Sequence, residues 1–186
     1  MSNSPTPEDR DALRAALITH YPQCAALPVL LVDISSQQLF IKNPSDEEEI
    51  SYLVSTAANG MGCDEGSGCT PPGAHIIKEK FGDQCPIGTI FRGRQDTAEI
   101  ATILTAPDAL SPADNITTRI LWLDGLEDGV NRGGDVDSYR RYIYLHGTDE
   151  EGRLGTAVSH GCVRLANRAV VEVFDATPCG ALVYLY

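Results

Sequence analysis

From residue 29 onward, apolar and polar positions alternate with a period of two, the pattern of β-strands that bury one face. Stretches rich in β-branched and aromatic residues are separated by short breakers such as Ser-Ser and Pro-Ser-Asp. The pattern predicts strands at 29–34, 38–42, 50–56, 73–79, 89–92, 118–124, 142–146 and 181–186. We therefore expect a mainly β fold, a sandwich or barrel of mostly antiparallel strands with a few short helices.

Two segments have helical patterns instead. Thr6, Pro7 and Asp9 form a helix start, with Thr6 as N-cap and Asp9 completing a capping box. Residues 1–28 are therefore predicted to hold an N-terminal helix packed on the main domain, which would span residues 29–186. A second helix is predicted from Asn167, as its N-cap, to Ala176. The polar stretch 107–117 is predicted to be a turn-rich loop that forms part of a lid.

Length and charge narrow the class of protein. The 186 residues suffice for one domain with a sizeable core. The formal net charge of −12 argues against nucleic acid or an anionic membrane as a partner. The acidic runs 46–49 and 149–151 are predicted to be solvated loops.

The first residues have neither the cationic region nor the apolar region of a secretory signal. No stretch reaches the roughly 18 apolar residues of a membrane helix. We therefore expect a cytoplasmic location, and a periplasmic one if a leader has been removed.

The six cysteines are expected to be reduced thiols, because a chain of this length does not need disulfide staples. The alternative is a metal site made by Cys63, Cys69, Cys85 and His75. Its spacing matches no zinc knuckle, so neither a metal nor a cofactor is expected.

The most specific pattern is Ser159-His160-Gly161-Cys162-Val163-Arg164, together with an upstream pair, His146-Gly147. A thiol with an ordinary pKa of about 8.5 needs a basic or cationic neighbour to become a thiolate at neutral pH. An imidazole supplies that neighbour and returns the proton to a leaving group. Gly161 allows a backbone N–H to approach a developing oxyanion. These residues predict a cysteine acyl-transfer enzyme.

The same segments resemble the signature of the L,D-transpeptidase (YkuD-type) catalytic domain family. Its motifs are matched by residues 144–148, 154–155 and 159–165, and upstream by 29–40, 54–57 and 70–73. The resemblance covers residues 29–186 and implies the family's YkuD-like β-sandwich or barrel. Departures are Ala57 in place of Gly, Arg164 where some members have Asn, and a shorter stretch of 12 residues between His146 and Ser159.

The resemblance implies that Cys162 is the nucleophile and His146 the general base. The carbonyl of Gly147 would orient the His146 ring. His160 is expected to support the loop or the oxyanion site with Gly161, although an exchange of roles between the two histidines stays open.

Three further residues are candidates for the site. Ser159 is expected to bond its own loop backbone. Arg164 either binds a substrate carboxylate through its bidentate guanidinium or forms a salt bridge that shapes the loop. Tyr144 would share a strand face with His146 and line the pocket.

The resemblance implies action on peptidoglycan stem peptides or muropeptides. The thiolate would attack the meso-diaminopimelyl–D-Ala bond of a tetrapeptide, releasing D-Ala and leaving a thioester. The expected cytosolic location favours water as acceptor, which gives an L,D-carboxypeptidase of murein recycling. The alternatives are an L,D-transpeptidase that forms 3→3 cross-links or exchanges D-amino acids, and a muropeptide-binding module without turnover. The sequence leaves the oligomeric state open.

Overall fold

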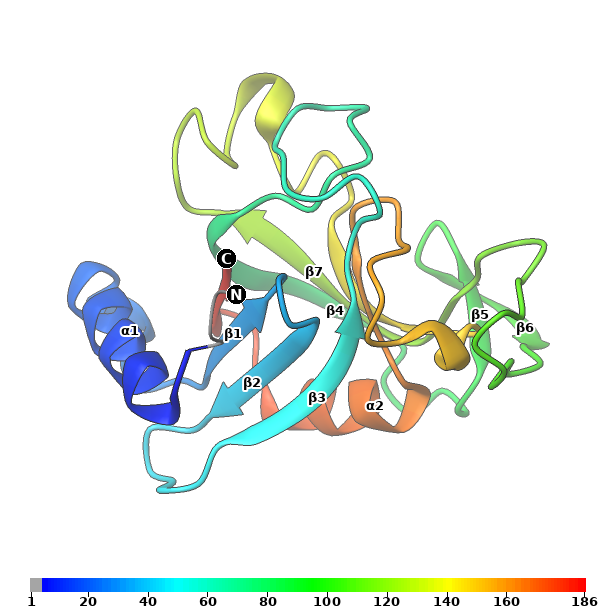
Figure 1. Ribbon diagram of the computed structural model, residues 1–186, viewed down its shortest axis with the longest axis horizontal. Helices are drawn as coiled ribbons and strands as arrows, with labels where there is room; N and C mark the ends of the chain where they lie inside the picture. The colour runs from blue at the N-terminus through cyan, green and yellow to red at the C-terminus, as the bar shows by residue number, and fades with distance from the viewer. Residues whose placement is uncertain (1–4) are drawn as a thin grey trace.

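The computed structural model describes residues 5–186 (Figure 1). Its two α-helices within that range are α1 (Pro7–His20) and α2 (Asn167–Ala176), and short 3₁₀ helices occupy Pro22–Cys24, Gly134–Val136 and Glu151–Arg153. The strands are β1 (Val29–Asp33), β2 (Gln38–Lys42), β3 (Ile50–Ser55), β4 (Gly73–Phe81), β5 (Thr89–Arg92), β6 (Gln95–Ile100), β7 (Ile116–Gly125), β8 (Tyr144–Thr148), β9 (Val163–Leu165) and β10 (Leu182–Leu185). No helix in the described range is both long and apolar enough to cross a bilayer.

The strands form a sheet that closes on itself. Their order is β4-β10-β1-β2-β3-β9-β8-β7, and β4 also pairs with β7, which completes the ring. The β5–β6 hairpin extends the sheet beyond β7 and projects from one side of the molecule (Figure 1). Most neighbours are antiparallel, but β1 pairs with β10 and β8 with β9 in parallel. The predicted mainly β, barrel-like fold is confirmed.

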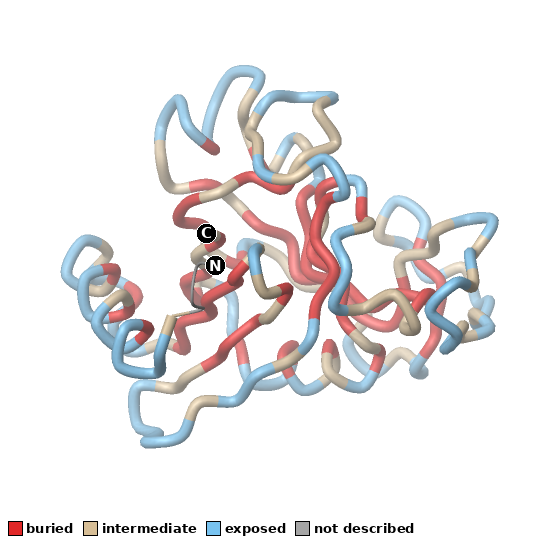
Figure 2. Tube along the Cα trace, in the orientation of Figure 1, coloured by how far each residue is buried: buried red, intermediate tan, exposed pale blue. Residues whose placement is uncertain are grey.

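The core lies on both sides of the strand layer, and Figure 2 shows buried backbone concentrated in the central strands. In β1, Leu30 and Val32 join the main cluster inside the ring, to which α2 contributes Phe174. The alternate residue Leu31 joins a second cluster with Leu17 of α1. Covering on both faces accounts for the unbroken apolar run of β1 from Val29 to Val32.

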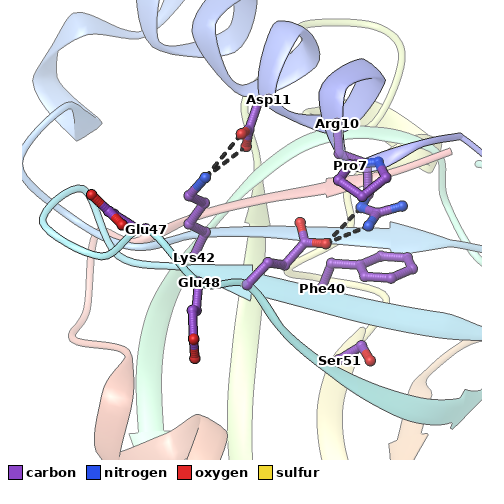
Figure 3. Close-up of a pocket in the computed structure, with 9 residues that line it drawn as sticks. Pro7, Arg10, Asp11, Phe40, Lys42, Glu47, Glu48 and Ser51 are labelled. Atoms are coloured by element: carbon purple, nitrogen blue, oxygen red, sulfur yellow. Dashed lines mark hydrogen bonds and ion pairs between the residues drawn. The ribbon is translucent and has the colours of Figure 1, made fainter.

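Helix α1 is held to the barrel by charged contacts (Figure 3). The Arg10 guanidinium lies 3.9 Å from the centroid of the Phe40 ring and pairs with Glu49. Lys42 pairs with Asp11 at 2.9 Å. A cavity of about 420 Å³ lies between α1 and β2, but these charged groups already pair with one another. They fix the helix in place and sit apart from the chemistry described below.

The helix predictions are partly right. Thr6 and Asp9 form the expected capping box of α1, and α2 ends at Ala176 as predicted. Asn167 is not the N-cap, however, since Ala166 holds that position. The Asn167 side chain instead points inward, where its Oδ1 accepts from Thr117 Oγ1 at 2.6 Å. In the interior, the side-chain amide of Asn167 forms hydrogen bonds for which a helix terminus has no partners.

The strand predictions fail where local pattern is weak. The strand predicted at 142–146 begins only at Tyr144, because Tyr142 has φ 57° and lies in a turn. Strand β6 was missed because its residues are polar and mostly exposed. Strand β9 was missed because it is three residues long. The irregular stretch 101–115 ends where β7 begins, at Ile116.

His75 is a buried histidine whose two ring nitrogens contact other groups of the protein. Its Nδ1 lies 3.0 Å from the Gly73 carbonyl and its Nε2 lies 2.9 Å from Ser138 Oγ. Both ring nitrogens are therefore engaged, which argues against the zinc alternative. No group of three potential metal ligands gathers anywhere in residues 5–186. Burial lowers the pKa of His75 to about 4.

This burial predicts an acid-sensitive fold. A pKa lowered from 6.5 to about 4 means that the unfolded chain binds the proton first, so stability is lost as the pH falls from about 6.5 towards 4. Between pH 7 and 5, the free energy of unfolding of His75→Gln should fall by about 2 kcal/mol less than that of the wild type, as measured by urea unfolding. The exposed His20 provides the matched control, His20→Gln. Equal pH dependence in the two variants would contradict the burial of a neutral His75.

Candidate active site

The parallel pairing of β8 and β9 brings the predicted residues together. Leu145 pairs with Val163 and His146 with Arg164, and Cys162 immediately precedes β9. Cys162 and His146 consequently line one cavity of about 170 Å³. Its remaining walls are Asp114, Ile116, Ser159, His160 and Arg164.

His146 is held in one orientation by the residue that follows it. Its Nδ1 lies 2.7 Å from the Gly147 carbonyl oxygen, and the residue is 4% exposed. Since a carbonyl only accepts, Nδ1 carries the hydrogen and Nε2 keeps a lone pair for accepting a proton. Gly147 has to be a glycine here, because a Cβ would lie 2.7 Å from the Thr117 carbonyl oxygen. This is the geometry that the family resemblance implies for the histidine and its backbone partner.

The Cys162 sulfur lies against the start of β8. The Tyr144 N–H donates to Sγ at 3.4 Å, and the thiol donates to the Tyr142 carbonyl oxygen at 3.4 Å. The thiol thus bonds to main-chain groups rather than to the His146 ring. The N–H of Cys162 itself donates to no acceptor within residues 5–186, which leaves it available to an oxyanion.

Burial sets the protonation of the pair. It raises the pKa of the Cys162 thiol to about 11, which the Tyr144 N–H only partly offsets. It lowers the pKa of His146 to about 4, although the bond to Gly147 acts in the opposite direction. At neutral pH the resting site therefore holds a thiol and a neutral imidazole. The thiolate predicted from sequence has to be made during the reaction.

The loop before the cysteine is fixed by Ser159. Its hydroxyl donates to the Cys162 carbonyl oxygen at 2.6 Å and accepts the Gly161 N–H at 3.3 Å. The expectation that Ser159 bonds its own loop agrees with this geometry. The expectation that the Gly161 N–H faces an oxyanion does not, because Ser159 occupies it. Gly161 has φ 135°, a conformation that favours glycine.

His160 occupies the rim of the cavity. Its side chain is 85% exposed, and its Nδ1 lies 3.2 Å from Asp114 Oδ2. His146 is buried beside the thiol, whereas His160 faces solvent. The geometry therefore favours His146 as the base over the exchanged assignment.

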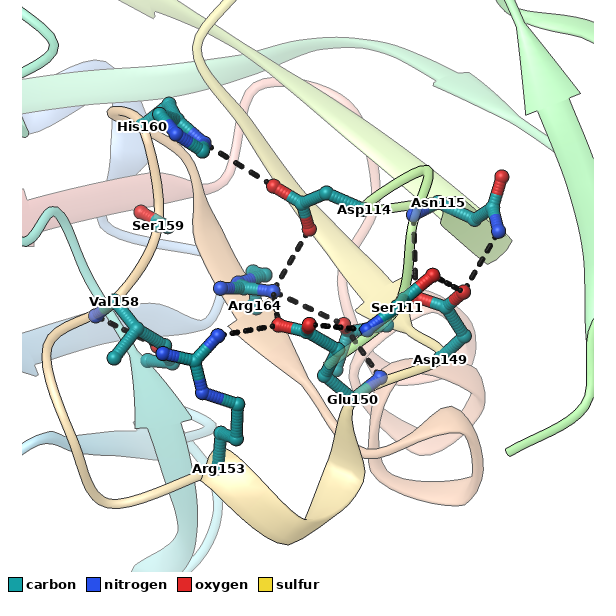
Figure 4. A network of polar contacts seen from close by, with 12 residues as sticks. Ser111, Asp114, Asn115, Asp149, Glu150, Arg153, Val158, Ser159, His160 and Arg164 are labelled. Atoms are coloured by element: carbon teal, nitrogen blue, oxygen red, sulfur yellow. Dashed lines mark hydrogen bonds and ion pairs between the residues drawn. The ribbon is translucent and has the colours of Figure 1, made fainter. Parts of the chain in front are cut away.

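Arg164 is buried in a polar network (Figure 4). It is 2% exposed, and its Nη1 lies 2.8 Å from both Asp114 and Glu150. The salt-bridge interpretation of Arg164 describes this arrangement, since both carboxylates already neutralise the guanidinium. Asp114, from the loop before β7, thereby links Arg164 to His160. Sequence reasoning missed Asp114 because no motif marks it.

The acidic run 149–151 is not a solvated loop as predicted. Asp149 and Glu150 are each 3% exposed. Asp149 accepts from Ser111 Oγ at 2.6 Å, and Glu150 accepts from Arg153 at 3.0 Å (Figure 4). These buried acids tie the loop before β7 to the end of β8.

Tyr144 is predicted to line the pocket, but it is not among the residues that line the cavity at Cys162. Its side chain belongs instead to an aromatic cluster with Trp122, against which Cys162 packs. The ring meets Trp122 edge-to-face with centroids 5.5 Å apart, and its hydroxyl accepts from Arg94 Nη1 at 3.1 Å. Only the backbone N–H of Tyr144 reaches the sulfur. Arg94 is a further residue that the sequence motifs did not reveal.

A second cavity of about 330 Å³ lies on the far side of Tyr142. Its walls are Glu65, Gly66, Gly68, Arg140, Arg141, Tyr142, Ile143 and His160. Arg141 donates to the carbonyl oxygens of Gly62 and Cys69 at 3.3 and 2.8 Å, which ties down the glycine-rich loop. His160 borders both cavities, whereas Cys162 lines only the smaller one.

The Arg164 network predicts a structural effect of substitution. Arg164→Lys keeps the charge but cannot reproduce the guanidinium contacts to buried Glu150 and partly exposed Asp114, so it should cost about 2 kcal/mol of stability. We expect Tm to fall by roughly 4–8 °C in a thermal scan. Arg153→Lys is the control, since Arg153 is more exposed and contacts Glu150 alone. An unchanged Tm with a raised KM would show that Arg164 binds substrate instead.

Protonation of the site predicts how Cys162 responds to alkylation. With a thiol pKa of about 11, its iodoacetamide rate should rise about tenfold per pH unit from pH 6 to beyond 9. The rate is read by mass spectrometry of the peptide containing Cys162, with exposed Cys179 as internal reference. A plateau below pH 7 would indicate a resting thiolate–imidazolium pair and contradict this account.

Comparison with known proteins agrees with the geometry. The sequence model of the YkuD L,D-transpeptidase catalytic domain matches residues 28–185. The YkuD proteins of Bacillus licheniformis and Bacillus subtilis are 36% and 34% identical over 58 residues, which is 28% of this chain and 35% of each relative. The match thus spans about a third of the length of these relatives.

Solved structures show the same fold. L,D-transpeptidase 3 of Mycobacterium tuberculosis, with a faropenem-derived adduct, aligns with TM-score 0.51 and 15% identity over 86% of this chain and 60% of that one. Bd1075 of Bdellovibrio bacteriovorus aligns with TM-score 0.51 and 14% identity over 87% of this chain and 48% of that one. With the family match covering most of its length, the chain belongs to the YkuD L,D-transpeptidase catalytic domain family.

Proposed function

We propose that the chain is a cysteine acyl-transfer enzyme that cleaves the meso-diaminopimelyl–D-Ala bond of peptidoglycan stem peptides. The observation that carries the proposal is the His146 ring, fixed by Gly147 and sharing a cavity with Cys162. Family membership supports peptidoglycan as the substrate class. The intact thiol and imidazole disfavour a binding module without turnover.

The chemistry starts from a neutral pair. The Cys162 thiol rotates about its Cα–Cβ bond away from the Tyr142 carbonyl, and His146 Nε2 accepts its proton as sulfur attacks the scissile carbonyl carbon. The N–H of Cys162 stabilises the resulting oxyanion. The imidazolium then protonates the amine of D-Ala, which leaves, and a thioester remains.

The acceptor has to reach the thioester where His146 can deprotonate it. That position is the 170 Å³ cavity, below the roughly 300–1,000 Å³ of typical ligand pockets. It suits water or a small amino acid better than a second stem peptide. The larger cavity beyond Tyr142 is then left for the donor peptide. We therefore favour L,D-carboxypeptidase activity, and its place in cytosolic murein recycling remains a prediction.

The second candidate is an L,D-transpeptidase that uses a stem-peptide amine. This candidate is favoured by the family match, because the matched domain is described as an L,D-transpeptidase catalytic domain. It requires the loop before β7, which carries Asp114, to move and widen the cavity. Such a movement would break the contacts of Asp114, which is 35% exposed and links His160 to Arg164.

The covalent step predicts one labelled cysteine. Incubation with a penem or carbapenem should add a single adduct mass to the wild type. The Cys162 thiol should open the strained β-lactam ring in the same way as it would attack the substrate amide. Cys162→Ala should give no adduct and no turnover, while Cys179→Ala behaves as the wild type. Intact-mass spectrometry gives the readout. An adduct that persists in Cys162→Ala would contradict the assignment of the nucleophile.

The size of the acceptor cavity predicts the products. Purified tetrapeptide at high concentration should yield tripeptide and free D-Ala, which liquid chromatography with mass spectrometry resolves. Predominant dimer with a 3→3 cross-link would favour the transpeptidase. Adding a D-amino acid tests exchange, which the cavity also admits.

A further inference from the structure

One arginine stands at a turn where its backbone is strained. Arg92 pairs with Gln95, so Gly93 and Arg94 form the two-residue turn between β5 and β6. Both turn residues have positive φ, 54° at Gly93 and 68° at Arg94. Such turns prefer Gly, Asn or Asp, because other residues pay for the left-handed backbone. An arginine held in this backbone conformation therefore suggests a role for its side chain.

The Arg94 side chain lies on the aromatic cluster of Trp122 and Tyr144, against which Cys162 packs. It donates to the Tyr144 hydroxyl at 3.1 Å, and its guanidinium carbon lies 4.5 Å from the Trp122 ring centroid and 5.3 Å from that of Tyr142. The N–H of Tyr144 in turn donates to Cys162 Sγ. Tyr144 and His146 are two residues apart on β8, so their side chains extend from the same face of the strand.

The charge of Arg94 is not balanced by the protein. It forms no ion pair within residues 5–186, in a chain with a net charge of −12. Arg164 pairs with two carboxylates, and Arg141 is occupied by main-chain carbonyls. Arg140 borders the donor cavity but is exposed. A fixed guanidinium with free donors is suited to binding a carboxylate.

We propose that Arg94 binds the carboxylate at the far end of the diaminopimelyl side chain of the donor peptide, an inference that rests on the proposed function. The cavity at His146 receives the leaving D-Ala, so the D-Ala carboxylate lies on that side of the sulfur. The methylene chain of diaminopimelate extends the other way along β8, over Trp122 and Tyr142. Arg94 is thus a specificity-determining residue that distinguishes this side chain from one ending in an amine alone.

The test measures peptide binding without turnover. Trp122 is the single tryptophan and lies under Arg94, so its fluorescence reports tetrapeptide binding to the Cys162→Ala protein. Adding Arg94→Asn should weaken binding roughly 10- to 100-fold. Tm should hold, because Asn suits the turn. Arg92→Asn is the matched control, an exposed neighbour that contacts only Asn115.

Two amidated peptides identify the carboxylate. A tetrapeptide amidated at the diaminopimelyl side-chain carboxylate should bind with equal affinity whether or not the Cys162→Ala protein also carries Arg94→Asn. A tetrapeptide amidated at D-Ala should still lose affinity on that substitution. The inference is overturned if amidation at D-Ala removes the effect of Arg94→Asn. It is also overturned if neither amidation removes that effect. A loss in Arg140→Asn instead of Arg94→Asn overturns it as well.

The same titrations separate this inference from the proposed function. Cleavage of tetrapeptide by the wild type with unchanged binding in the Arg94→Asn protein would refute the role of Arg94 and leave the function standing. If the Cys162→Ala protein binds none of the three peptides and the wild type cleaves none, the proposed function fails and this inference fails with it.

Discussion

The site depends on the parallel pairing of two short strands, β8 and β9. Parallel neighbours require a crossover connection, and here the chain between them makes buried contacts through Glu150 before it returns at Ser159. A register shift of one residue would turn His146 to the other face of the sheet and separate it from Cys162. Gly147 constrains β8 against its other neighbour, β7, since only a glycine fits against Thr117.

Burial then determines the chemistry. The imidazole is buried and the thiol half-buried, and this loss of solvation favours the neutral form of each. The nearest buried cation, Arg164, is already neutralised by Asp114 and Glu150. In the mechanism we propose, the site generates charge only as the substrate arrives, and an imidazole held by a main-chain carbonyl supplies the proton transfer without a third side chain.

The features that could be predicted from the sequence are those that depend on residues close together in the chain. Period-two strands, the α1 capping box and the Ser159–Arg164 motif were recognisable because each is short-range. Asn167 was misplaced because its buried partners come from a distant strand, which outweighed its preference for a helix cap. Asp114 and Arg94 reach the site from separate loops, so no spacing in the chain marks them. Asp149 and Glu150 look solvated until their partners are known.

Nuclear magnetic resonance of histidine labelled with ¹⁵N tests the central claim most directly, with His146→Gln used to assign the signals. The account predicts that His146 is neutral, carries its hydrogen on Nδ1, and begins to titrate only near pH 4. A midpoint near 6.5, or a hydrogen on Nε2 at neutral pH, would contradict it. The hydrogen on Nε2 would remove His146 as the base that acts on Cys162, and the midpoint near 6.5 would refute its burial as a neutral imidazole.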